Sequence, residues 1–276
     1  MFSTPPRRSQ PSNHSPLGEL SITQSSSSFS YLCPSVPSVV KLNTVLPANR
    51  YRNGPEMFTS AGSDMHGIVA MAGLDLPPGL ALWRVSLDEL RGEWDRFHSW
   101  LSPDEQERAR RFHFERDRDH FILRRGSLRW ILARYLDLDP AAIGFAYGPA
   151  GKPALVADNA ERVRFNVSHS DGLALFAVSA HHEVGVDVER VRPVPEAGAI
   201  LERHFSRETV ARWRGLSVEQ QPEAFLHSWV RHEAEVKRSG QGLAGIREEH
   251  GADSAKGEVL GFVPAPGYVG ALAWEG

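Results

Sequence analysis

Two acidic side chains lie two residues apart in the apolar segment Gly185-Val186-Asp187-Val188-Glu189. Residues i and i+2 of a strand project from the same face, so this spacing predicts that Asp187 and Glu189 stand side by side. Two neighbouring carboxylates repel each other unless a cation or protons lie between them. The pair therefore indicates either a divalent-cation site or a solvated strand face on which Asp187 lies beside Arg190 or Arg192.

A second charged pair follows in the helix-like segment 229–239. Glu233 and Lys237 are four residues apart and share one helix face with Trp229. An exposed pair of this kind stabilises a helix by only about 0.2–0.5 kcal/mol. Because Trp229 is expected to pack, we predict that the pair lies part-buried at the edge of a cleft. Gly240 is expected to end the helix in the left-handed conformation.

Three acids and a lysine are a suitable set for chemistry on a phosphate ester. Magnesium prefers oxygen ligands and retains substrate phosphates in its shell, so Asp187, Glu189 and Glu233 are the candidate metal ligands. Lys237 would add a positive charge next to the ion, where it can stabilise a charged leaving group.

The composition is that of a globular protein and excludes several function classes. The 276 residues are enough for one large domain or two small ones, and the formal net charge of −3 gives no overall basic field for nucleic acid. The single cysteine, Cys33, cannot form an intramolecular disulfide or a cysteine-based zinc cluster. No apolar run has the roughly 18 residues of a membrane span. We therefore expect a cytoplasmic protein with no membrane or nucleic-acid partner.

The first 70 residues differ from the rest of the chain. They contain a run of four serines (25–28), scattered prolines and only three acids. This composition predicts a disordered extension, since little apolar surface offsets the entropy of ordering. It also loosely fits a transit peptide in residues 1–56, and a further alternative is that translation begins at Met57, Met65 or Met71. We favour the later start.

Hydrophobic periodicity predicts the elements that position these residues. Strands are expected at 81–87 and 267–273, a strand that runs into a polar loop within 164–170, and an antiparallel hairpin at 173–179 and 184–191. Helices are expected from Ser102-Pro103-Asp104-Glu105, whose serine, proline and acids are start signals, and at 117–136, 206–216 and 222–239. This mixed order predicts an α+β fold.

Two arginines, Arg124 and Arg125, interrupt the apolar stripe of the predicted helix 117–136. A basic residue on a buried face usually pairs with a carboxylate and less often meets a ligand phosphate. His169, at the polar end of the segment 164–170, and Lys152, in the turn Gly151-Lys152-Pro153, are ordinary structural or solvated residues in one interpretation and phosphate contacts in the other.

Four segments in this order resemble the Sfp-type 4′-phosphopantetheinyl transferases. They are Gly151-Lys152-Pro153, Asn166-Val167-Ser168-His169-Ser170, Gly185–Glu189 and Trp229–Leu243, and the similarity extends over roughly residues 80 to 273. The resemblance implies a pseudo-symmetric pair of α+β halves, with boundaries expected at 71–180 and 181–276. Coenzyme A would lie in the cleft between them, and the protein would be a monomer.

The resemblance also implies an activity. The phosphopantetheine arm of coenzyme A would move to a serine of an acyl or peptidyl carrier protein, releasing adenosine 3′,5′-bisphosphate. Glu233 would be the base and Lys237 would stabilise the departing phosphate, with Mg²⁺ held by Asp187, Glu189 and Glu233. The expected contacts to coenzyme A phosphates come from Arg111, Lys152, Ser168 and His169.

The chain departs from the family pattern at three places. His232 stands where the family usually has lysine, Val230 replaces a small or polar residue, and the segment after Leu243 is short. These departures leave open a non-catalytic protein that still binds coenzyme A. A metal-dependent nuclease is a further alternative, because residues 107–134 contain nine arginines against four acids.

Overall fold

The computed structural model describes residues 65–147, 153–156, 159, 162–240 and 257–275. The predictions made for residues 1–64 and for Lys152 lie outside these residues. Within them, the chain has mixed helices and strands, as the sequence predicted.

The first half is an antiparallel sheet covered by helices. Strands β1 (Ile68–Ala70), β2 (Leu80–Ser86), β6 (Leu173–Ser179) and β5 (Arg164–Ser170) lie in the order β1-β2-β6-β5. The helices are α1 (Trp94–Trp100), α2 (Pro103–Arg110) and α3 (Glu115–Leu136), with 3-10 turns at Asp88–Glu93 and Pro140–Ala142. A separate two-stranded sheet joins β3 (Phe145–Tyr147) to β4 (Pro153–Leu155).

The second half repeats this plan with fewer strands. Strands β7 (Val184–Arg190), β9 (Tyr268–Trp274) and β8 (Glu258–Phe262) form an antiparallel sheet in the order β7-β9-β8. Its helices are α5 (Ala197–His204), α6 (Arg207–Arg214) and α7 (Gln220–Ser239). The long helix of this half, α7, has 20 residues, close to the 22 of α3.

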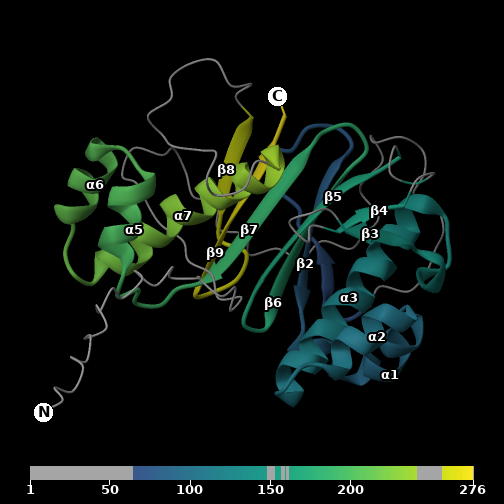
Figure 1. Ribbon diagram of the computed structural model, residues 1–276. Helices are drawn as coiled ribbons and strands as arrows, with labels where there is room; N and C mark the ends of the chain where they lie inside the picture. The colour runs from purple at the N-terminus through teal and green to yellow at the C-terminus, as the bar shows by residue number, and fades with distance from the viewer. Residues whose placement is uncertain (1–64, 148–152, 157–158, 160–161, 241–256, 276) are drawn as a thin grey trace, which may run out of the picture.

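The two halves stack as four layers (Figure 1). One core lies between α3 and the first sheet, and includes Phe97, Phe121, Ile131 and Phe176. A second core joins the two sheets through side chains such as Leu175, Val186 and Leu272. Helix α7 covers the outer face of the second sheet, where Val230 and Ala234 pack against Ala271 and Ala273. The carboxylates of β7 face this helix layer.

The start of α2 and the ends of α3 and α7 lie where the local sequence signals predict. Glu105 accepts a hydrogen bond from the backbone N–H of Ser102, which completes a capping box at the start of α2. Gly240 ends α7 in the left-handed conformation with φ 69°, as predicted. Helix α3 ends at Leu136, as predicted, and is followed by Asp137 in the left-handed conformation with φ 55°.

The predicted hairpin is wrong. Strands β6 and β7 follow each other along the chain, yet β6 pairs with β2 and β5, whereas β7 pairs with β9. The two apolar runs and the short connection between them are typical of a hairpin, but each strand finds its partner far away in the sequence. His169, predicted to lie in a polar loop after the strand, is instead the sixth residue of β5.

Candidate active site at the junction of the two halves

The polar side chains of β5 join the first half to the free edge of β7. The side-chain oxygens of Asn166, Ser168 and Ser170 accept hydrogen bonds from the backbone N–H groups of Val186, Val188 and Arg190, at 3.0, 3.3 and 3.1 Å. The register advances by two residues on each strand, so β5 and β7 run parallel. Side chains thus replace the main-chain ladder at this edge. The sequence predicted a role for Ser168 but none for Asn166 or Ser170, although the N-x-S-x-S alternation was visible.

Asp187 lies at the centre of this junction and is almost fully buried. Its Oδ1 accepts a hydrogen bond from Ser168 Oγ at 2.6 Å and from Lys237 Nζ at 2.6 Å. The ammonium group of Lys237 also lies 3.3 Å from Ser168 Oγ. Strands of both halves and helix α7 therefore converge on one carboxylate.

Helix α7 reaches Asp187 because it crosses β7 at a glycine. A Cβ atom on Gly185 would overlap the carbonyl oxygen of Ala234 and the backbone nitrogen of Arg238. Contact between the backbones at this point brings the next turn of the helix, with Glu233 and Lys237, over the acidic residues of the strand. Glu233 and Lys237 are both partly buried, as predicted.

The charges at the junction strongly influence one another. Burial and the negative charge of Asp187 raise the pKa of Glu189 well above its usual value. Burial also raises the pKa of Glu233 to about 7, although Lys237 opposes this change. Burial disfavours the Lys237 ammonium, but the attraction of Asp187 and Glu233 outweighs it and raises the lysine pKa. The lysine thus remains charged while the acids compete for protons.

The carboxylates are not already gathered as a metal cluster. Among the residues that the structure describes, no group of three or more His, Cys, Asp or Glu side chains is arranged to hold a metal ion. The oxygen donors nevertheless suit a hard cation. Oδ2 of Asp187 is buried and makes no hydrogen bond, and the repulsion between Asp187 and Glu189 would be relieved by a positive ion.

Basic side chains from α3 and β5 lie near Lys237. His169 points to the face of β5 that packs towards α3, since its alternate neighbours Phe165 and Val167 belong to the core around that helix. Burial, followed by the positive charges of Arg124 and Lys237, lowers the pKa of His169 well below its usual value.

Burial, followed by the positive charges of Arg125 and Arg108, lowers the pKa of Arg124 to about 9. No ion pair among the described residues includes Arg124.

Arg125 has a structural role. Its Nε lies 3.3 Å from the buried carboxylate of Glu105, which Arg129 also contacts at 2.7 Å. Its guanidinium group lies over the ring of Phe145 and donates to the Tyr147 hydroxyl. Arg125 thus follows the carboxylate-pair interpretation, whereas Arg124 beside it does not.

The other candidate residues lie elsewhere or outside the described part. Arg111, at the end of α2, is exposed and pairs with Glu107 at 3.3 Å.

His232 is buried among the rings of His204, Phe205 and Trp229. The residue that departs from the family pattern therefore packs against α5, on a different side of α7 from Lys237.

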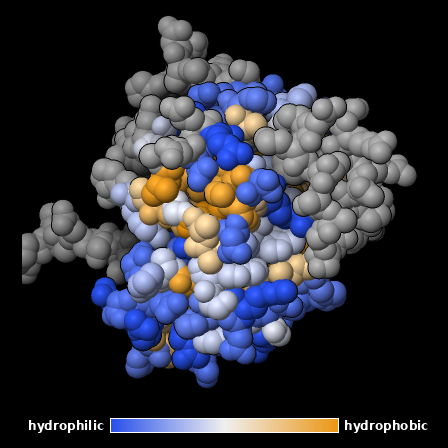
Figure 2. Space-filling model, turned by 90° about the vertical axis from the view of Figure 1, so that its right-hand side faces the viewer, coloured by the Kyte–Doolittle hydropathy of each residue, from blue (hydrophilic) through white to orange (hydrophobic). Residues whose placement is uncertain are grey.

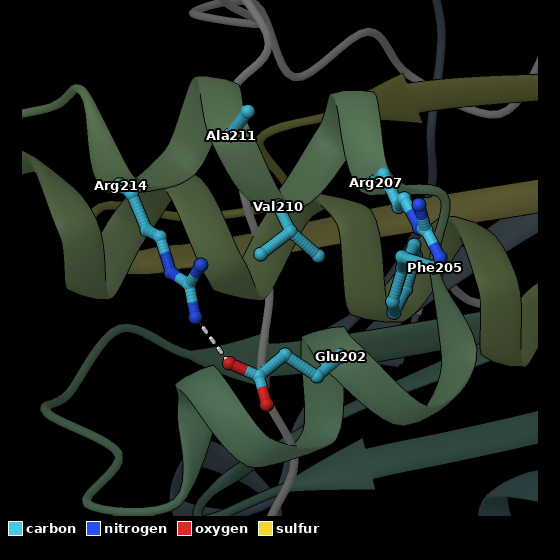
Figure 3. Close-up of a pocket in the computed structure, with 6 residues that line it drawn as sticks. All are labelled: Glu202, Phe205, Arg207, Val210, Ala211 and Arg214. Carbon is cyan, nitrogen blue, oxygen red and sulfur yellow. Dashed lines mark hydrogen bonds and ion pairs between the residues drawn. The ribbon is translucent and has the colours of Figure 1, made fainter.

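A separate pocket of about 540 Å³ lies between α5 and α6 (Figure 3). It has an apolar floor of Phe205 and Val210, and an ion pair between Arg214 and Glu202 borders it. None of the candidate catalytic residues lines this pocket. We assign the chemistry to the junction, because the buried and mutually interacting charges are there.

The fold and the site define a two-half α+β protein with a charged site at the junction of its halves, and comparisons with known proteins agree. Residues 83–181 match the family model described as 4′-phosphopantetheinyl transferase, N-terminal, and residues 183–257 match that of the 4′-phosphopantetheinyl transferase superfamily.

Individual relatives support the same assignment. The chain is 37% identical over 183 residues to 4′-phosphopantetheinyl transferase HetI of Nostoc sp., covering 63% of this chain and 77% of the relative. It is 29% identical over 152 residues to 4′-phosphopantetheinyl transferase Sfp of Bacillus subtilis, covering 55% and 66%. A human L-aminoadipate-semialdehyde dehydrogenase-phosphopantetheinyl transferase is 28% identical over 162 residues, covering 55% and 52%. The chain belongs to the 4′-phosphopantetheinyl transferase family of enzymes.

Proposed function

We propose that this chain transfers the 4′-phosphopantetheine arm of coenzyme A to a serine hydroxyl of an acyl or peptidyl carrier protein, in a Mg²⁺-dependent reaction. The observation that carries the proposal is the contact of Lys237 with Asp187 at 2.6 Å, which joins α7 to the acidic strand in a chain of this family. The family matches and the transferase relatives support the reaction type.

The proposed metal ligands are Asp187, Glu189 and Glu233. A magnesium ion there would supply positive charge and Lewis acidity to the pyrophosphate of coenzyme A. The buried, unbonded Oδ2 of Asp187 supports this assignment.

Glu233 is the proposed general base. In the metal-free protein the pKa of Glu233 is about 7, and a bound cation would lower it, so the carboxylate would be ionised and able to accept a proton near neutral pH. The serine oxygen would attack the phosphorus that carries the pantetheine arm, and the serine proton would pass to Glu233. As the new P–O bond forms, the bond to the bridging oxygen breaks, and adenosine 3′,5′-bisphosphate leaves. Lys237 would donate hydrogen bonds to the departing phosphate.

The phosphates of coenzyme A would meet the basic groups of the first half. We propose contacts from His169 and Arg124, whose positive surroundings favour an anion. Lys152 and Arg111 remain proposed contacts to the adenosine-side phosphates. The hydroxyl of Ser168 is bonded to Asp187, so a contact from Ser168 to a phosphate would have to replace that hydrogen bond.

The test is labelling of an apo carrier protein with a fluorescent coenzyme A analogue. We expect labelling with Mg²⁺, none with EDTA, and at least a roughly 100-fold lower rate for Asp187→Ala and Glu233→Gln. Arg190→Gln is a matched control. Arg190 is the last residue of β7, the strand of Asp187, and its exposed side chain pairs with Asp171. Efficient labelling by Asp187→Ala, or in EDTA, would refute the proposed roles.

The nuclease alternative is not favoured. Several arginines of residues 107–134 are neutralised by neighbouring acids, as in the pairs Arg110–Glu107 and Arg118–Glu115. The face of the first half is mainly hydrophilic, with an apolar area near its middle (Figure 2). A surface of paired charges around an apolar area does not resemble a continuous basic stripe for a nucleic-acid backbone.

A further inference from the structure

Ser170 is a buried residue of the junction to which the proposed function gives no role. Its side chain is 1% exposed, and that of its partner, Glu189, is 2% exposed. The hydroxyl oxygen accepts a hydrogen bond from the backbone N–H of Arg190 at 3.1 Å and lies 3.0 Å from Glu189 Oε2. A serine hydroxyl has a single hydrogen. Because the Arg190 N–H uses an acceptor lone pair, that hydrogen is available for the carboxylate.

The same pattern occurs two residues earlier. Ser168 accepts from the N–H of Val188 and donates to Asp187, the residue before it. Asp187 is held twice, by Ser168 and by Lys237. For Glu189, the hydrogen bond that the described residues provide is the one from Ser170. The two serines of β5 thus hold the two acids of β7 in the same way.

We propose that Ser170 is a positioning residue that fixes the carboxylate of Glu189 for cation binding. Groups that hydrogen-bond to a metal-ligating carboxylate orient it, and their loss typically lowers metal affinity by about 10- to 100-fold. The acid is carried by the second half and the serine by the first, so the first half contributes to the cation site through Ser170. This inference rests on the metal ligands of the proposed function.

The test is Mn²⁺ binding, followed by electron paramagnetic resonance of the free ion, with coenzyme A at saturating concentration. We expect Ser170→Ala to weaken Mn²⁺ binding about 10-fold or more, and Ser170→Thr, which keeps the hydroxyl, to retain most of the affinity. The matched control is Ser179→Ala. Ser179 is equally buried in the same sheet, and its hydroxyl accepts from the backbone N–H groups of His181 and His182, without a carboxylate partner among the residues that the structure describes.

The outcomes separate the inference from the function on which it rests. Weak binding by Ser170→Ala alone, with melting temperatures lowered alike in Ser170→Ala and Ser179→Ala, supports a positioning role. Binding by Ser170→Ala within twofold of the wild type overturns the inference and leaves the cation site intact. Equal losses in Ser170→Ala and Ser179→Ala show a merely structural effect and also overturn it. Absence of Mn²⁺ binding by the wild-type protein overturns the metal assignment itself.

Discussion

Lys237 and Asp187 are separated by 50 residues in the chain, and their contact is the most direct link between α7 and the acidic strand. In the absence of a metal ion the ammonium group balances the charge of a carboxylate that is 5% exposed. Removing it leaves Asp187 buried with one less donor. The contact therefore contributes to stability, and the role that we propose for Lys237 in the reaction is separable from it.

We predict that Lys237→Met lowers the transfer rate by about 100- to 1,000-fold, because the developing charge of the leaving phosphate loses its donor. The variant should also be less stable by about 1–3 kcal/mol, since a hydrogen-bonded buried carboxylate loses a partner. Transfer kinetics and urea unfolding measure the two effects. An active and equally stable variant would show that the contact with Asp187 affects neither the transfer rate nor the stability of the protein.

Glu233 gives the site a pH dependence. Its pKa is raised from about 4.5 to about 7, so the native state binds more protons than the unfolded state between these values. The stabilisation from the protonated acid is complete below about pH 4.5 and is lost as the pH rises through 7, and the full change is on the order of 3 kcal/mol.

We predict that Glu233→Gln makes the metal-free protein lose less stability than the wild type between pH 5 and pH 8. Because glutamine cannot ionise, the variant does not have the stability loss that ionisation of Glu233 causes in the wild type. Urea unfolding of both proteins at the two pH values measures the difference, and comparing the two cancels the contribution of other groups. The same loss in both proteins would place the pKa of Glu233 near its ordinary value.

At the scale of elements, the crossing of α7 over β7 depends on Gly185. We predict that Gly185→Ala displaces the helix, destabilises the protein by about 3 kcal/mol and lowers transfer about 100-fold, because a displacement of roughly 1 Å spoils the geometry of reacting groups. Transfer kinetics and thermal unfolding measure both effects.

The matched control is Gly261→Ala on strand β8 of the same sheet. There the added methyl group meets only the end of the flexible Arg231 side chain, at 3.3 Å. This variant should remain close to the wild type. If Gly185→Ala behaved like Gly261→Ala, the close approach of the two backbones would not position the site.

The sequence predicted the elements with strong local signals and failed where pairing is distant. Helices α3 and α7 follow from apolar stripes and end signals, and β5 was predicted in part, because the expected polar loop at its end is strand as far as Ser170. The β6–β7 hairpin was wrong because the residues of β7 pair with residues of β9 that lie 78 to 90 positions further along the chain, and no local pattern indicates such a partner. The short strand β8 and helix α5 were missed because few residues carry their periodicity.

The candidate site shows the same contrast between local patterns, which a sequence displays, and contacts between distant elements, which it does not. Asp187, Glu189, Glu233 and Lys237 were proposed as site residues from their spacing, since residue types at fixed intervals are visible in a sequence. The roles of Ser170 and Gly185 were not predicted, because they depend on which elements touch. Arg124 and Arg125 look alike in the sequence, and only Glu105, brought in by α2, separates their roles.

At the scale of the whole molecule, the site exists because two similar halves meet. The first half provides β5 and the basic groups of α3, and the second provides the acids and α7 (Figure 1). Among the described residues, no helix is long and apolar enough to cross a bilayer. We propose that the junction places a phosphate-binding surface from one half against a cation-binding surface from the other, as transfer between coenzyme A and a carrier protein would require.

The most direct test of the proposed cation site is anomalous diffraction from crystals grown with Mn²⁺ and coenzyme A. We expect one strong anomalous peak at the junction, at roughly 2.1 Å from carboxylate oxygens of Asp187, Glu189 and Glu233 and next to the pyrophosphate. A peak bound by other residues, or a pyrophosphate held at the junction by Lys237 without any ion, would contradict it.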